Sequence, residues 1–140
     1  MSKPKNENLI ASVEIVVPFH DVDIMHVVWH GHYAKYFEIA RCKLLPQIHC
    51  DHESMRELGY VWPIVKAQQK FIEGARFDQI LTVTAEAVEW DVMLVINYKV
   101  MDASTGKVLV KGQTTQAAVN MKTGETCFQT PDFFRERLGV

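Results

Sequence analysis

Residues 17–41 read VPFHDVDIMHVVWHGHYAKYFEIAR and contain the change from an alternating apolar segment to an apolar helix. Upstream of the change, every second side chain is apolar, which predicts a half-buried strand over residues 11–19 that includes Phe19. Downstream, apolar side chains recur every three or four positions, which predicts a largely buried helix over residues 31–45 that stops at Pro46. The predicted apolar stripe of the helix consists of Tyr33, Tyr36, Phe37, Ile39, Ala40 and Leu44.

The rest of the chain is predicted to be mostly strands, over residues 62–73, 81–87, 94–100 and 107–121. Turn-like composition separates the later strands at residues 90–91 and 102–107. Residues 51–58 are predicted as a short helix or a loop, residues 131–138 as a terminal helix, and residues 1–8 as disordered. One long apolar helix among strands indicates a single α+β domain over residues 1–140, in which an antiparallel sheet curves around the helix. The order of elements does not fit alternating βαβ units.

Composition narrows the functional classes. The chain has 140 residues, 48% hydrophobic and 23% charged, which is typical of one globular domain with a single core. A formal net charge of −2 gives no support for a nucleic-acid or membrane-surface partner. The sequence has no apolar run long enough to span a bilayer and no apolar N-terminal core of a secretion signal. Three cysteines without metal-type spacing predict reduced thiols and a cytoplasmic location.

The link between the predicted strand and helix is rich in titratable groups. Asp23 lies just before the helix, whose first backbone N–H groups and positive partial charge suit a developing oxyanion. A carboxylate there can attack a carbonyl carbon or activate a water that does so. The backbone of Gly31, His32 and Tyr33 would hold the carbonyl oxygen. The alternative is that Asp21 and Asp23 are turn or capping residues, which are common roles for aspartate.

Other polar residues of the segment allow more than one role. His30 could orient a substrate or assist proton transfer, and the alternative is a structural histidine beside a helix start. Asp21, His26 and Glu38 are possible supporting groups, although Glu38 is more simply a solvated or ion-paired helix residue. Histidine and carboxylate are also metal ligands, but no HxxxH or HExxH pattern falls on a predicted helix, so we expect no metal site.

The motif F-H-D-V-D-I-M-H-V-V-W-H-G-H-Y, from Phe19 to Tyr33, resembles the active-site segment of hot-dog-fold acyl-CoA thioesterases. The similarity continues through Y-F-E-I-A-R (residues 36–41) and A-R-F-D (residues 75–78), and with the order of elements it covers most of the chain. The nearest match is to the 4-hydroxybenzoyl-CoA thioesterase group, including the Tol–Pal-associated bacterial acyl-CoA thioesterases.

This resemblance implies a fold, an activity and an assembly. The fold is a curved antiparallel sheet wrapped around one long helix, as the periodicity also predicts. Asp23 would be the nucleophile or general base of thioester hydrolysis, His30 would assist, and the backbone at residues 31–33 would polarise the thioester carbonyl. No cofactor is implied beyond the coenzyme A moiety of the substrate. The resemblance also implies a homodimer, or a tetramer built from two dimers, with active sites at the subunit interface and residues contributed by both chains.

Two positions depart from the family pattern. Relatives usually carry a small residue or glycine where this chain has His26, which predicts a narrower acyl pocket or an added polar contact. Some relatives also carry basic residues for the CoA phosphates near the turn after the third strand, where this chain has D-V-M (residues 91–93). The candidate replacements are Lys66, Lys70, Arg76 and Lys111. An acyl carrier protein is the alternative carrier of the thioester.

The leading functional prediction is therefore a thioesterase that hydrolyses acyl-CoA, or a related acyl thioester, to a free acid and a thiol. Two other readings of the same fold stay open. One is a hydratase or dehydratase that acts on hydroxyacyl thioesters, and the other is a protein that binds acyl thioesters without turnover.

Overall fold

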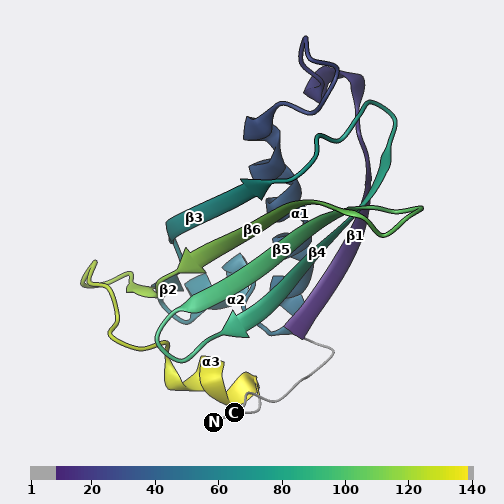
Figure 1. Cartoon of the computed structure of the whole chain (residues 1–140). Coiled ribbons are helices and arrows are strands. Elements are labelled where there is room, and N and C mark those ends of the chain that lie inside the picture. Colours follow the sequence, from purple (N-terminus) through teal and green to yellow (C-terminus); the bar gives the residue numbers. More distant parts are fainter. Residues whose placement is uncertain (1–8, 139–140) are drawn as a thin grey trace.

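The computed structural model describes residues 9–138, so the predicted disorder of residues 1–8 lies outside the described residues. A five-stranded antiparallel sheet curves around one long helix, α1 (Figure 1). The elements in chain order are β1 (Ile10–Val16), α1 (Tyr33–Gln47), α2 (His52–Glu57), β2 (Tyr60–Val61), β3 (Ile64–Phe71), β4 (Ile80–Glu89), β5 (Leu94–Asp102), β6 (Val108–Gln116), β7 (Val119–Asn120) and α3 (Asp132–Arg137). The strand order in the sheet is β1-β4-β5-β6-β3, and β2 pairs with β7 separately.

The core lies between α1 and the inner face of the sheet. Alternate side chains of β4 and β5 are buried, as their period-two pattern predicted. Phe37 of α1 stacks on Tyr98 of β5 with ring centroids 4.7 Å apart. Gly112 of β6 lies beneath the same ring, where a Cβ atom would collide with Phe37. The helix can therefore approach the sheet closely because this position lacks a side chain.

Two residues assigned to the buried faces from sequence are exposed instead. Ile39 is 44% exposed, because the part of the stripe around Tyr36, Phe37 and Ala40 already fills the space against the sheet. Phe19 is 75% exposed, because β1 ends at Val16 and the chain turns into a single 3-10 turn at Phe19–Asp21.

Two predicted boundaries are also wrong. Pro46 lies inside the last turn of α1 and does not stop it; the helix ends one residue later, at Gln47, so the hydrogen bond that proline cannot donate is lost only in the last turn. The predicted strand 107–121 divides into β6 and β7. Between them the amide of Ala117 donates to the carbonyl of Pro63 at 3.3 Å, and the chain turns toward β2.

The segment predicted as a helix or a loop is a helix, and the predicted terminal helix is present. The segment at residues 51–58 forms α2, whose N-cap is Asp51; its side chain accepts a hydrogen bond from the Ser54 amide. The terminal helix is α3. Within residues 9–138, no helix is both long and apolar enough to cross a membrane.

Within residues 9–138, strand β3 forms one edge of the sheet and pairs with β6 alone. Seven of its eight residues are exposed, among them Ile64, Val65 and Phe71. Side chains on both the inner and the outer face of β3 are therefore exposed at this edge of the sheet.

Candidate active site

A hollow of about 250 Å³ lies where the start of α1 meets the end of β3. It brings together the two residues that the sequence ranked first, Asp23 and His30. Its walls are formed by Asp23, Val27, Val28, His30, Tyr33, Phe71, Ile72, Glu73 and Gly74.

The loop that carries Asp23 is held by the segment that follows β3. The amide of Val28 donates to the carbonyl of Ala75 at 2.8 Å, and the amide of Asp78 donates to the carbonyl of Val17 at 3.0 Å. Gly74 allows close approach, because a Cβ atom there would collide with the side chain of Val27. These contacts fix the Asp23 loop against the rest of the fold at both ends.

Asp23 begins a tight turn with a well-defined geometry. Its Oδ1 accepts a hydrogen bond from the Met25 amide at 2.8 Å, and its carbonyl accepts one from the His26 amide at 3.0 Å. Among the residues that the structure describes, no donor contacts the second carboxylate oxygen, Oδ2. The turn thus orients the carboxyl group while leaving one oxygen available to a ligand.

His26 occupies the last position of this turn in the left-handed region, with φ of 63°. Glycine adopts that conformation without strain, whereas a side chain does not. His26 is exposed and is not part of the wall of the hollow. The expected narrowing of a pocket by His26 therefore finds no support in this chain, and the backbone conformation explains why a small residue would suit the position.

The start of α1 is preceded by a 3-10 turn at His30–His32. The Trp29 indole packs against the rings of His30 and His32, with ring centroids 4.9 and 5.3 Å away. Gly31 passes directly under this indole, and a Cβ atom there would collide with it. The His32 amide already donates to the Trp29 carbonyl at 2.9 Å, so Gly31 and Tyr33 are the better candidates for holding a substrate oxygen.

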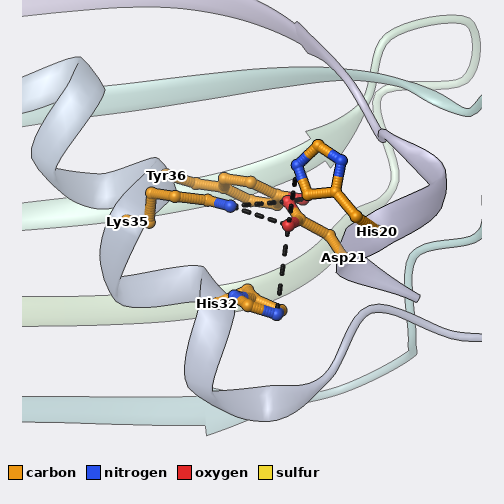
Figure 2. Close-up of polar contacts among 5 residues, drawn as sticks. All are labelled: His20, Asp21, His32, Lys35 and Tyr36. Atoms are coloured by element: carbon orange, nitrogen blue, oxygen red, sulfur yellow. Dashed lines mark hydrogen bonds and ion pairs between the residues drawn. The ribbon is translucent and has the colours of Figure 1, made fainter. Parts of the chain in front are cut away.

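Asp21 lies outside the hollow in a polar cluster of its own (Figure 2). Its side chain is buried and accepts hydrogen bonds from Lys35 at 2.7 and 2.9 Å and from the Tyr36 hydroxyl at 2.6 Å. The ring nitrogens of His20 and His32 lie 3.6 and 3.9 Å from the same carboxylate. Asp21 therefore anchors the loop to α1.

Opposing effects act on the ionisation of this cluster. Burial raises the pKa of Asp21, but the hydrogen bonds from Lys35 and Tyr36 and the Lys35 charge outweigh it, so the pKa lies below its ordinary value. The pKa of Tyr36 is raised, first by burial and then by its bond to the Asp21 carboxylate. Asp21 is consequently ionised and Tyr36 neutral at physiological pH.

Tyr33 joins the first turn of α1 to the segment after β3. Its hydroxyl accepts a hydrogen bond from the Ala75 amide at 3.1 Å, and both residues are buried. Burial raises the pKa of Tyr33; the Ala75 bond lowers it, while the nearby Asp23 charge raises it further. The ring of Tyr33 thus forms a fixed, neutral wall of the hollow.

Several wall residues were not foreseen from the sequence. Phe71 reaches the hollow from β3, with its ring centroid 6.2 Å from that of His30. Glu73, the last residue of the strand predicted over residues 62–73, lines the hollow and pairs with Lys107 at 2.8 Å. Glu38, by contrast, is exposed on α1 near Arg41 at 3.9 Å and does not reach the hollow. In the described part of the chain, no three His, Cys, Asp or Glu side chains converge as metal ligands.

A family model described as the thioesterase-like superfamily matches residues 17–138, from the end of the first strand through the last helix. The chain belongs to the thioesterase-like superfamily. The match includes Asp23, His30 and the whole of the hollow that they line.

Individual proteins are also similar to this chain in sequence or in structure. A Synechocystis sp. protein provisionally named an esterase is 28% identical over 120 residues, which is 85% of this chain and 72% of that protein. A hypothetical Thermus thermophilus protein of known structure is 25% identical, with a TM-score of 0.80 over 93% of this chain and 98% of that chain. An Asp-to-Asn mutant of 4-hydroxybenzoyl-CoA thioesterase, solved with 4-hydroxybenzoyl-CoA, is 17% identical, with a TM-score of 0.79 over 93% and 99%. These similarities confirm the predicted α+β hot-dog fold.

Proposed function

We propose that this protein hydrolyses acyl-CoA thioesters to a free acid and coenzyme A. The observation that carries the proposal is the hollow shared by Asp23, His30 and the start of α1. Membership of the thioesterase-like superfamily supports the same reaction class.

In the proposed reaction the thioester carbonyl lies at the start of α1. The amides of Gly31 and Tyr33 would stabilise negative charge on its oxygen. The carboxylate of Asp23 then acts through Oδ2, in one of two ways. As a nucleophile it forms a mixed anhydride and expels the CoA thiolate, and water cleaves the anhydride; as a general base it takes a proton from the attacking water. His30 is placed to hydrogen-bond the thioester or to protonate the departing thiolate.

The walls of the hollow suggest which acyl groups it takes. Phe71, Tyr33 and two valines make it largely apolar, and its volume of about 250 Å³ suits a short or ring-shaped acyl group better than a long chain. The relative solved with 4-hydroxybenzoyl-CoA is consistent with such a substrate and with CoA as the carrier.

We further propose that two copies associate through β3. An exposed edge strand with apolar side chains is an aggregation hazard unless another chain covers it, and Ile64, Val65 and Phe71 are all at least 43% exposed. Antiparallel pairing of two β3 strands would set the Phe71 end of one copy, where the hollow lies, beside the Ile64 end of the other. Such an arrangement agrees with the interface active site that the family resemblance implies.

The proposed activity is tested by incubating the wild-type protein with a panel of acyl-CoAs: 4-hydroxybenzoyl-CoA, a short straight-chain and a long straight-chain acyl-CoA. We expect saturable release of free CoA thiol, fastest with the aromatic or short substrate. Hydration of an enoyl-CoA without thiol release would identify a hydratase. Acyl-CoA binding in calorimetry with no thiol release from any substrate would identify a binding protein. Either of these results would overturn the proposal.

A further inference from the structure

A second hollow, of about 360 Å³, lies on the face of the sheet that points away from α1. In Figure 1 this outer face is turned toward the viewer, with α1 behind β3, β6 and β5. The hollow is bordered by one lysine from each of these three neighbouring strands: Lys70 of β3, Lys111 of β6 and Lys99 of β5.

The three lysines stand in one row across the sheet. Lys111 is directly opposite Lys70 in the pairing of β3 with β6, and directly opposite Lys99 in the pairing of β5 with β6. Side chains at such paired positions are close neighbours on one face, and like charges there destabilise a sheet. The row therefore contains two unfavourable charge pairs side by side.

The three lysine charges are unpaired within the part of the chain that the structure describes. All three lysines are exposed, and within residues 9–138 none of them forms an ion pair. The next position of the row, on β4, is the uncharged Thr84. The remaining polar groups of the hollow are neutral amides, of which Gln113 donates to Asn97 at 2.8 Å. A protein with a formal net charge of −2 thus concentrates three positive charges at one place.

We propose that Lys70, Lys99 and Lys111 form a binding site for the phosphate groups of a nucleotide. Lysine ammonium groups serve as point charges for phosphate, and a bound polyphosphate would turn the repulsion within the row into attraction. The identity of this nucleotide rests on the proposed function: the ligand is the nucleotide part of the CoA thioester. A free nucleotide offers the same chemistry.

The position of the row fits a ligand that extends from the candidate active site. Lys70 immediately precedes Phe71, and the two side chains lie on opposite faces at the end of β3. Phe71 lines the hollow of Asp23 while Lys70 lines the lysine hollow. A thioester with its acyl group beside Phe71 would pass over the segment at residues 72–74 to reach the lysines. The site thereby supplies the phosphate contacts that the D-V-M turn at residues 91–93 lacks.

The decisive variants are Lys111→Gln and Lys99→Gln, with Lys66→Gln as the matched control. Lys66, a candidate for the CoA phosphates on sequence grounds, lies on the same strand and face as Lys70 but does not border the hollow, so it is not part of the proposed site. For Lys111→Gln, we expect the KM for an acyl-CoA to rise about 5- to 10-fold at low salt with kcat unchanged. The KM for the matching acyl-N-acetylcysteamine thioester, which has no nucleotide, should stay the same. Lys66→Gln should leave both values unchanged.

Calorimetry with CoA and with ADP keeps the test independent of turnover. Weaker binding of CoA by Lys111→Gln, without an effect of Lys66→Gln, supports the site even if no thioester is hydrolysed. If Lys111→Gln loses ADP binding but keeps the wild-type KM for acyl-CoA, the site is assigned to a free nucleotide. Unchanged binding of both ligands in Lys99→Gln and Lys111→Gln, or an equal effect of Lys66→Gln, would overturn the proposal.

Discussion

The backbone amide of Ala75 donates a hydrogen bond to the hydroxyl of Tyr33 at 3.1 Å, and neither residue is more than 2% exposed. This bond joins the first turn of α1 to the segment that follows β3. It therefore fixes two walls of the candidate active site relative to each other.

Replacing Tyr33 with Phe should destabilise the protein and disturb the site. The Ala75 amide would stay buried without an acceptor, which costs about 1–3 kcal/mol of unfolding free energy. We expect this loss in urea denaturation together with a several-fold lower kcat. Tyr98→Phe is the control, because it removes a buried hydrogen bond to Thr114 at 2.7 Å, and neither residue lines the hollow of Asp23. Equal kcat values for the two variants would contradict a positioning role for Tyr33.

The buried carboxylate of Asp21 should make stability depend on acid pH. Its pKa lies below the ordinary value of 3.8, so its contacts with Lys35 and Tyr36 contribute fully above about pH 4 and are lost as the pH falls through the lowered pKa. Asp21→Asn should cost about 1–3 kcal/mol at pH 7. The difference between variant and wild type should shrink at pH 3, as measured by guanidinium denaturation. A difference that is constant over this range would contradict the assignment.

The left-handed conformation of His26 predicts that glycine is the better residue at this position. His26→Gly should raise the unfolding free energy by about 0.5–1 kcal/mol, since relief of backbone strain exceeds the added entropy of the unfolded chain. His26→Ala, which keeps the strain, should have no such effect. Thiol release should be the same in both variants, because His26 does not line the hollow. A large loss of activity in His26→Gly would instead indicate a chemical role for the imidazole.

Association through β3 should be sensitive to a charge placed on that edge. Val65→Lys introduces a charge on an exposed position of the strand, which is 55% exposed in the single chain. We expect light scattering to give a dimer or larger assembly for the wild type and a monomer for the variant. The matched control is Val16→Lys on β1, the opposite edge, where the valine is 54% exposed. If Val16→Lys gives a monomer and Val65→Lys does not, the interface lies at the β1 edge, which would contradict association through β3.

The sequence was sufficient for those parts of the fold that rest on local periodicity. The stripe of α1 and the alternation of β4 and β5 follow directly from residue spacing, and so the architecture was predictable. The break between β6 and β7 was not, because it depends on a hydrogen bond from Ala117 to Pro63, which is distant in sequence.

The candidate site was predictable only in part, for a similar reason. Asp23 and His30 could be selected because they flank a helix start. Residue spacing could not predict that Asp21 is buried whereas Asp23 lines the hollow. The difference arises because Lys35 and Tyr36 donate hydrogen bonds to the carboxylate of Asp21 and not to that of Asp23. Phe71 enters the hollow only because β3 lies at the sheet edge beside the start of α1, which a linear pattern does not show.

The claim that Asp23 is the reacting carboxylate is tested most directly by the turnover of Asp23→Asn. Asparagine can still accept the hydrogen bond from the Met25 amide, so the turn and the fold should be kept, as circular dichroism and Tm would verify. We predict a 10²- to 10⁴-fold lower kcat for acyl-CoA hydrolysis, with binding of the substrate retained. A folded Asp23→Asn protein that turns over the same substrate at the wild-type rate would contradict the claim.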